Sequence, residues 1–191
     1  MLLKENIENY SEDFYDNIKL PNDLEEKYKN LLSTKTKKIF KMSFHLKDKL
    51  AKHLLLEDNR IYYGKFGKPY LQKKNTKIEF SISHHDDYVV LYYNDNKPVG
   101  IDILNTNKVK NSYFTSPYFS PEEKDFSITK ENFCKIWMVK EAYGKLLGCG
   151  LQREISNINL LPFIGKIYKD IQIRIEFFEN FTLCICEKII N

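Results

Sequence analysis

An α+β fold is predicted by the sequence, because helical spacing and strand alternation each occur twice along the chain. Residues 34–56 and 131–147 place apolar side chains three and four positions apart. Residues 78–103 and 171–185 instead alternate apolar with polar side chains. The first spacing is typical of an amphipathic helix and the second of a half-buried strand. The predicted order is therefore helix then sheet, twice.

In the first half, helices are expected before strands. The opening residues suit a surface strand or loop, followed by a short helix around residues 23–32. Residues 34–56 are rich in lysine and place Phe40, Phe44 and Leu50 near helical spacing. This pattern predicts one or two amphipathic helices.

Three consecutive strands are expected to end the first half and begin the second. Residues 78–82 alternate, a turn follows at 84–87, and residues 88–93 form a second strand. Residues 94–98, Asn-Asp-Asn-Lys-Pro, have turn chemistry, and a third strand follows at 99–103. We expect these strands to form an antiparallel meander.

The second half repeats the order with one long helix and a hairpin. Residues 106–129 have no clean period, whereas residues 131–147 are helical in spacing and end at Gly148, a good helix stop. The alternating runs 171–177 and 181–185 flank a turn and predict a final hairpin.

The chain is expected to form two tightly packed halves. A length of 191 residues with 42% hydrophobic residues suffices for a real core. No Gly/Ser linker or low-complexity tract divides the chain. We place an N-terminal α+β half at residues 1–98 and a C-terminal half, carrying the metal site, at residues 99–191.

Composition bears on whether the protein binds nucleic acids or membranes and on its cellular compartment. The net charge of +4, from 30 Lys and Arg against 26 Asp and Glu, lacks the dense basic stripe of a nucleic-acid binder. The four cysteines show no C-x-x-C pairing, which favours reduced thiols over a zinc site. No apolar run is long enough to cross a bilayer. We expect a cytoplasmic monomer that does not bind membranes.

Two carboxylates stand out as candidate metal ligands. Asp102 lies near the end of an apolar strand, where burial of an unpaired carboxylate is costly. Glu141 shares one helix face with Trp137 and Lys145. The simpler interpretation of that face is a surface Glu-Lys pair over a core tryptophan. Together with Asp102, however, Glu141 is suited to Mg²⁺, which takes few protein ligands and leaves positions for phosphate oxygens and water.

Several basic and polar residues complete a possible diphosphate site. Lys145 and Lys68 can neutralise phosphate charge, and Ser83 with His84 can bind a further phosphate at the end of a strand. Each residue alone is commonplace, because Gly67-Lys68-Pro69 is also an ordinary turn and a histidine is common at a strand end.

The order of the motifs is more specific than any single motif. The chain contains G-K-P, F-S-I-S-H, V-G-I-D-I, F-S-P-E-E and W-M-V-K-E-A-Y-G-K-L-L-G-C-G-L. Over about residues 64–151 this series resembles the Sfp-type 4'-phosphopantetheinyl transferases. The resemblance implies a pseudo-symmetric α+β fold, each half a helix plus an antiparallel sheet, with coenzyme A in the cleft between the halves.

The resemblance also implies a role for each site residue. Asp102 and Glu141 hold Mg²⁺, and Glu123 matches an acidic position near the metal. Glu123 is equally suited to close a capping box with Ser120 at a helix start, and both roles can coexist. The coenzyme A ligands are Lys145 at the diphosphate and Lys68, Ser83 and His84 at the adenosine 3'-phosphate end.

The implied reaction is transfer of 4'-phosphopantetheine from coenzyme A to a serine of an apo acyl or peptidyl carrier protein, with 3',5'-ADP leaving. Mg²⁺ and Lys145 would supply most of the catalysis by neutralising charge. Glu141 or Glu123 accepts the serine proton, directly or through water, and the sequence leaves both open. Aromatic residues expected to contact the carrier, or to pack in the core, are Tyr113, Phe114, Tyr118 and Phe119.

One position departs from the family pattern. The family usually has G-I-D-I-E, whereas this chain has Leu104 at the second acidic position. Residues 102 and 104 share one strand face, so one metal ligand is missing and water is expected to replace it. Candidates for reaching the nucleotide from the N-terminal region are Lys37, Lys38, Lys49 and Lys52.

Two other classes of function remain open from the sequence. A non-catalytic relative that binds coenzyme A or another nucleotide would account for Leu104. An RNA- or DNA-binding protein could use the lysines of residues 35–52 with nearby aromatic residues, but it gives no reason for Asp102 and Glu141. Mg²⁺-dependent transfer and salt-dependent nucleic-acid binding separate the three.

Overall fold

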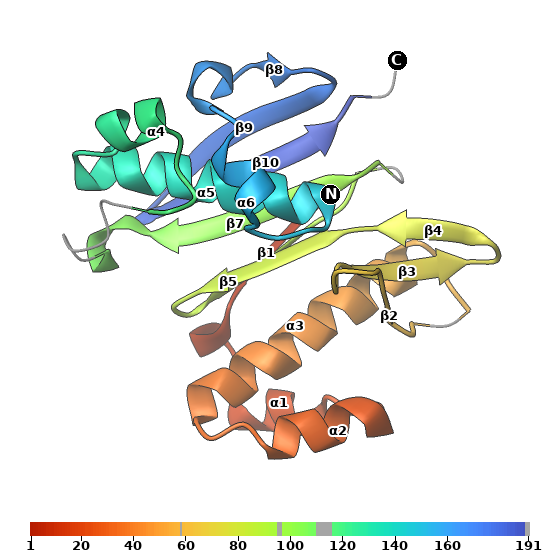
Figure 1. The fold of residues 1–191 in the computed structure, drawn as a ribbon. Helices are drawn as coiled ribbons and strands as arrows, with labels where there is room; N and C mark the ends of the chain where they lie inside the picture. Colours follow the sequence, from red (N-terminus) through yellow and green to blue (C-terminus); the bar gives the residue numbers. More distant parts are fainter. Residues whose placement is uncertain (58, 95–96, 110–115, 190–191) are drawn as a thin grey trace.

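Two sheets, each carrying one long helix, form the body of the protein. The computed structural model describes residues 1–57, 59–94, 97–109 and 116–189 (Figure 1). The first half contains α3 (Thr34–His53) over the sheet β1-β6-β5, and the second contains α5 (Lys130–Leu147) over the sheet β7-β10-β9-β8. The predicted α+β class is confirmed.

The helices of the first half stack at the bottom of the view in Figure 1. They are α1 (Glu12–Asn17), α2 (Asn22–Lys29) and α3, preceded by the 3₁₀ turn η1 (Ile7–Asn9). The lysine-rich segment predicted as one or two helices is a single helix of 20 residues. Its buried face, including Met42, Leu46 and Leu50, packs on β6 because apolar residues recur at helical spacing.

The first half contains two sheets of antiparallel strands. One has the order β1-β6-β5, from β1 (Leu2–Asn6), β6 (Tyr88–Tyr92) and β5 (Ser81–His85). The other is a small sheet of β2 (Tyr62–Tyr63), β3 (Pro69–Lys73) and β4 (Thr76–Glu79). The strand predicted from residue 78 onward is therefore interrupted at Phe80: β4 pairs with β3 and β5 pairs with β6.

The predicted three-strand meander is wrong in its last member. β7 (Val99–Asn105) pairs with β10 (Phe181–Lys188) in the second sheet, not with β6. All seven residues of β7 are buried, as befits a strand covered on both faces. β7 still lies beside β5, where the Ile101 amide donates to Ser81 Oγ at 3.0 Å. Sequence order alone thus predicted the hairpin β5-β6 but not the crossing to a new sheet.

The second half follows the predicted order. β9 (Ile171–Phe178) and β10 form the expected hairpin, and β8 (Ile167–Tyr168) extends the sheet. α5 ends at Gly148, whose φ of 76° gives the left-handed turn that glycine allows. Short elements complete this half: η2 (Thr106–Lys108), α4 (Pro121–Phe126), α6 (Arg153–Ser156) and η4 (Leu161–Phe163).

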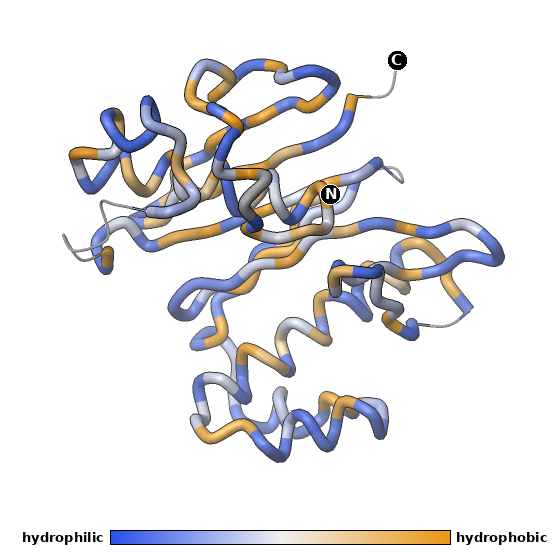
Figure 2. Tube along the Cα trace, in the orientation of Figure 1, coloured by the Kyte–Doolittle hydropathy of each residue, from blue (hydrophilic) through white to orange (hydrophobic). Residues whose placement is uncertain are grey.

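An apolar seam joins the halves. Val90 and Tyr92 of β6 pack against Val99, Ile101 and Ile103 of β7, with side chains of β10 behind them. Figure 2 shows hydrophobic stretches along these central strands and hydrophilic residues at the tip of the β3–β4 hairpin. β7 begins at the residue where the second half was predicted to start, and the division into residues 1–98 and 99–191 remains a prediction.

All four cysteines are free thiols, and Cys134, Cys184 and Cys186 are buried. Within the described ranges, no helix is long and apolar enough to span a membrane.

Gly100 permits β7 and α5 to touch through their backbones. A Cβ at this position would lie 2.6 Å from the Leu146 nitrogen and closer still to the Ala142 carbonyl oxygen. We therefore expect Gly100→Ala to lower the free energy of unfolding by about 2 kcal/mol or more, since overpacking against rigid backbone cannot relax. Urea denaturation measures the loss. Gly64→Ala is the control, because its Cβ would meet nothing nearer than the Lys68 carbonyl oxygen at 3.6 Å.

Candidate active site

A cleft of about 330 Å³ opens where β5, β7 and α5 meet. It combines residues from both halves of the chain. The polar side chains that line it are Ser83, His84, His85, Asp102, Glu141 and Lys145. Five of these were predicted site residues, so the fold gathers positions that are up to 62 residues apart, as in the Lys145–Ser83 hydrogen bond.

A hydrogen-bonded ion pair lies at the floor of the cleft. Asp102 Oδ1 accepts from Ser83 Oγ at 2.7 Å and from Lys145 Nζ at 2.6 Å, and Lys145 Nζ also lies 2.9 Å from Ser83 Oγ. Asp102 is only 7% exposed. Its burial is tolerated because an ammonium group and a hydroxyl replace the water it loses.

Glu141 lies one turn before Lys145 on α5 and lines the same cleft. Within the part of the chain that the structure describes, its carboxylate has no hydrogen bond and no ion pair. Burial raises the pKa of Glu141, the nearby Asp102 carboxylate raises it further, and Lys145 offsets only part of the rise. The cleft thus holds two carboxylates, Asp102 and Glu141, but of the described lysines only Lys145 has its ammonium group next to them. Their negative charge is not fully neutralised.

The donor set fits a hard divalent cation that binds mainly to other ligands. Among the described residues no cluster of three or more His, Cys, Asp and Glu side chains forms a metal site. Asp102 and Glu141 are two carboxylates, which is the small protein share typical of Mg²⁺ beside phosphate. These two residues are the ones that would hold the ion.

Leu104 occupies the position predicted to lack a ligand. It lines the cleft with Asp102 and packs in the core beneath α5, whereas Ile103 points into the seam between the sheets. Residues 102 and 104 therefore face the same side of β7, as the strand alternation predicts. Leu104 is 9% exposed and offers only methyl groups there.

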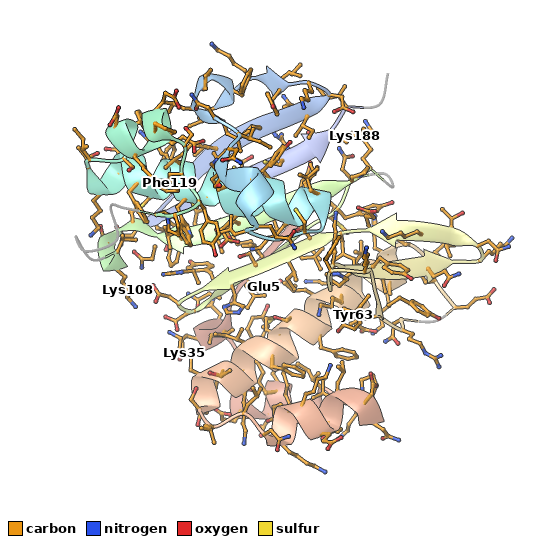
Figure 3. The ribbon with its side chains drawn as sticks, in the orientation of Figure 1. Glu5, Lys35, Tyr63, Lys108, Phe119 and Lys188 are labelled. Carbon is orange, nitrogen blue, oxygen red and sulfur yellow. The ribbon has the colours of Figure 1, made fainter. Side chains whose placement is uncertain are left out.

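Two further pockets adjoin the cleft on opposite sides. One of about 210 Å³ contains Lys68 and shares Ile82 and Lys145 with the cleft. The other, of about 410 Å³, shares His85, Leu104 and Trp137 with it. The second is lined mostly by apolar and aromatic side chains, with Lys108 at its edge. Lys108 and the core residue Phe119 are labelled in Figure 3.

His84 lies exposed at the mouth of the cleft. Partial desolvation, reinforced by the charges of Lys145 and His85, lowers the pKa of its imidazole. This shift favours the neutral imidazole, which offers an N–H group rather than a charge. His85, which lies in the segment predicted to be a turn, ends β5, is half-buried and lines both the cleft and the apolar pocket.

Lys68 is close to the cleft but its charge is already engaged. Its ammonium donates to Glu79 Oε2 at 2.7 Å and to the Leu146 carbonyl at 2.9 Å, and the side chain is 10% exposed. The predicted phosphate role is therefore in competition with these two bonds.

Glu123 is not part of the cleft. Its side chain is fully buried, and its oxygens accept from the Ser120 and Leu160 amides, both at 2.8 Å. Lys140 Nζ lies 2.8 Å from Glu123 Oε2, and this ion pair is completely inaccessible to solvent. The predicted capping box is confirmed. The predicted catalytic role conflicts with this placement, because a carboxylate enclosed in the core cannot meet a substrate.

Lys140 is a structural residue that our sequence reasoning missed. Besides Glu123, its ammonium donates to the carbonyls of Ile155 at 2.7 Å and Ile158 at 2.6 Å. A signal was present: this lysine stands between apolar positions on the buried face of a predicted helix, where a cation requires a partner.

The remaining predicted residues lie elsewhere. Tyr118 lines the apolar pocket, and Phe119 is 2% exposed and packs against Phe133 and Trp137. Tyr113 and Phe114 lie outside the described residues. None of the four N-terminal lysines lines the three pockets described above: Lys38, Lys49 and Lys52 pair with acidic residues, and Lys37 lies 5.5 Å from the Tyr28 ring centroid.

The cleft therefore places two carboxylates and a lysine at the junction of the two α+β halves. Comparison with known proteins makes this more specific. Residues 98–186 match the family model described as the 4'-phosphopantetheinyl transferase superfamily. This match and the curated relatives confirm the resemblance seen in the motifs.

Individual relatives agree. The chain is 27% identical over 164 residues to the 4'-phosphopantetheinyl transferase gsp of Aneurinibacillus migulanus, covering 73% of this chain and 68% of that protein. It is 27% identical over 104 residues to a phosphopantetheinyl transferase of Thraustochytrium, covering 44% and 36%. It is 30% identical over 126 residues to the human L-aminoadipate-semialdehyde dehydrogenase-phosphopantetheinyl transferase, covering 54% and 41%.

These matches confirm the prediction of an enzyme of the phosphopantetheinyl transferase class. The aligned residues cover 68% of the length of the Aneurinibacillus protein, but only 36% of the Thraustochytrium protein and 41% of the human protein.

The buried ion pair generates a prediction about stability. Lys140→Met leaves the Glu123 carboxylate buried without its cation, and we expect a loss of about 3–5 kcal/mol in the free energy of unfolding. The control is Lys135→Met, which removes an exposed pair with Glu131 on the same helix and should change stability by about 0.5 kcal/mol or less. Chemical denaturation of both variants is the measurement. Equal effects would show that the pair is not closed to solvent.

Proposed function

We propose that this protein transfers the 4'-phosphopantetheine group of coenzyme A to a serine of an apo carrier protein in a Mg²⁺-dependent reaction, releasing 3',5'-ADP. One observation carries the proposal: Asp102, Glu141 and Lys145 line a single cleft, beside Ser83 and His84 from the other half. The motif order and the family match supply the substrate class.

The row of three pockets supports one orientation of coenzyme A. Its diphosphate is the most highly charged part and fits the central cleft beside Lys145. Its pantetheine arm is largely uncharged and fits the apolar pocket beyond Leu104 and Trp137. The nucleotide end then lies toward His84 and the Lys68 pocket.

Asp102 and Glu141 are the residues that would hold Mg²⁺. Bound there, the ion would neutralise charge on the diphosphate, the main requirement of phosphoryl-type transfer. Lys145 supplies a second cation at the same place and keeps Asp102 oriented through their 2.6 Å contact. Ser83 donates a hydrogen bond to the same oxygen, Asp102 Oδ1, at 2.7 Å.

In the proposed step the serine oxygen of the carrier forms a bond to the phosphorus that bears pantetheine. The bond from that phosphorus to the bridging oxygen breaks, and 3',5'-ADP leaves with the bridging oxygen and its electron pair. The serine proton goes to a base. Of the two candidates, Glu141 lines the cleft with no partner in the described structure, whereas Glu123 is enclosed in the core. We assign the base to Glu141.

The carrier protein is expected to approach over the apolar pocket. Carrier proteins of this family commonly present an acidic helix, and Lys108 and Tyr118 at the pocket offer a cation and an aromatic surface. The cytoplasmic location and the monomeric state remain predictions.

A second candidate, a non-catalytic protein that binds coenzyme A, is favoured by Leu104, because this residue offers no donor atom to a metal. Transfer by the purified protein, detected as a mass gain on one serine of an apo carrier incubated with coenzyme A and Mg²⁺, separates the two.

Asp102→Asn and Glu141→Gln should each remove nearly all transfer activity. The two changes should differ in stability. Glu141→Gln removes a carboxylate that is destabilised by burial, is repelled by Asp102 and has no partner in the described residues, so the metal-free variant should be more stable than the wild type. Asp102→Asn leaves Lys145 without its ion pair and should be less stable. Transfer assays and thermal unfolding measure both effects.

Glu131→Gln, an exposed change on the same helix, is the control and should keep full activity. Near-normal turnover in Asp102→Asn or Glu141→Gln contradicts the assigned roles.

Leu104 provides a separate test of the metal site. Leu104→Glu adds a carboxylate on the face of β7 that carries Asp102, so it should lower the Mg²⁺ concentration needed for half-maximal activity. Leu104→Ala should leave that concentration nearly unchanged, since leucine offers no donor atom. Titration of Mg²⁺ against the transfer rate measures both, and no shift in Leu104→Glu would show that residue 104 does not face the ion.

A further inference from the structure

In the described part of the chain, Lys68 of the first half donates a hydrogen bond to the C-terminal turn of α5. The last carbonyls of a helix lack intrahelical partners and must be satisfied otherwise. The backbone amides of residues 148–150 donate hydrogen bonds to the Gly144 and Lys145 carbonyls. The Leu146 carbonyl instead accepts from Lys68 Nζ at 2.9 Å, across 78 residues of sequence. A cation at a helix C-terminus is favourable, because the carbonyl dipoles point toward it.

Lys68 is itself held firmly in this position. Its ammonium also donates to Glu79 Oε2 at 2.7 Å, at the end of β4, and Glu79 Oε1 accepts from Lys77 at 2.8 Å. The stem of Lys68 lies over Gly148, where an added Cβ would stand 3.3 Å from Lys68 Cδ. Burial lowers the pKa of Lys68, and the bond to Glu79 offsets part of that effect. The ammonium is therefore enclosed and directed at α5.

From this geometry we infer that Lys68 is a positioning residue: it fixes the C-terminal turn of α5 to the first half, and thereby sets where Lys145 meets Asp102. Lys145 is the residue next to Leu146, so movement of the Leu146 carbonyl shifts the backbone from which the Lys145 ammonium reaches the cleft. The kinetic consequence rests on the proposed function, and the contact itself does not.

The inference competes with the role of Lys68 as a phosphate ligand, and Glu79 distinguishes them. Glu79→Gln removes the charge that holds Lys68. A phosphate ligand freed in this way should bind coenzyme A as well as before or better. A positioning residue should instead lose its fixed direction, so Glu79→Gln should impair transfer in the same sense as Lys68→Met.

The kinetic experiment uses Lys68→Met, Lys68→Arg and Glu79→Gln with coenzyme A and with 3'-dephospho-coenzyme A. We expect Lys68→Met and Glu79→Gln to lower kcat by about tenfold for both substrates, because small misplacement of a catalytic group is costly. The preference for coenzyme A should stay unchanged, and Lys68→Arg should recover most of kcat. Lys77→Met is the control, since Lys77 contacts Glu79 but not α5.

A selective loss of affinity for coenzyme A over the dephospho form in Lys68→Met overturns the inference and restores the phosphate role. So does full activity in Glu79→Gln.

Hydrogen exchange tests the contact without any transfer activity. In Lys68→Met the amides of Gly148, Cys149 and Gly150, which close the end of α5, should exchange faster than in the wild type, while amides of β9 and β10 should not change. Unchanged exchange at residues 148–150 overturns the inference. Faster exchange in a protein that transfers nothing would instead uphold the inference while the proposed function fails.

Discussion

Where β7 passes beneath α5, Gly100 leaves no side chain between the strand and the Ala142 carbonyl. The helix therefore rests directly on the strand, and this distance sets how close the α5 side chains of the cleft lie to Asp102. Asp102 lies two residues beyond the contact on β7, and Glu141 and Lys145 lie on the same stretch of α5. A larger side chain at residue 100 would part the acidic and basic groups that the ion pair joins.

The contact also explains why a carboxylate can be buried here. Asp102 is covered by the helix that supplies its cation, so desolvation and pairing come from one packing event. Glu141, one turn earlier on α5, faces the open side of the cleft without such a cation. Its neighbour Lys140 points the opposite way, into the core, where Glu123 neutralises it. Two adjacent residues of one motif thus have different roles. Lys140 stabilises the fold, and Glu141 remains available for chemistry.

Local patterns in the sequence predicted much of this arrangement. Helical spacing located α3 and α5, alternation located the β9–β10 hairpin, and the left-handed glycine ended α5 where expected. The motif order predicted that Asp102, Glu141 and Ser83 belong to one site, and these three residues line one cleft. Strand periodicity alone predicted that Leu104 lies on the same face of β7 as Asp102.

Local patterns did not predict contacts between residues that are far apart in the sequence. Nothing between residues 94 and 98 indicates that β7 leaves its neighbours to pair with β10, because strand pairing depends on what the rest of the chain can cover. The direction of the Lys68 side chain depends on Glu79 and on a carbonyl 78 residues away. The enclosure of Glu123 depends on Leu160 and Lys140, which a capping box does not reveal.

The cleft lies on a seam to which each half contributes one part, with Ser83 from β5 and Asp102 from β7. The β1–β6 pairing joins residues up to 90 positions apart, and the Tyr92–Glu187 hydrogen bond joins residues 95 positions apart. Contacts so distant in sequence are entropically costly to form and generally slow a folding reaction. During refolding, the helices and hairpins can form early from nearby residues, while the cleft exists only after the two halves have docked. Binding competence therefore requires the two halves to dock, which makes it a more sensitive reporter of complete tertiary assembly than helix content.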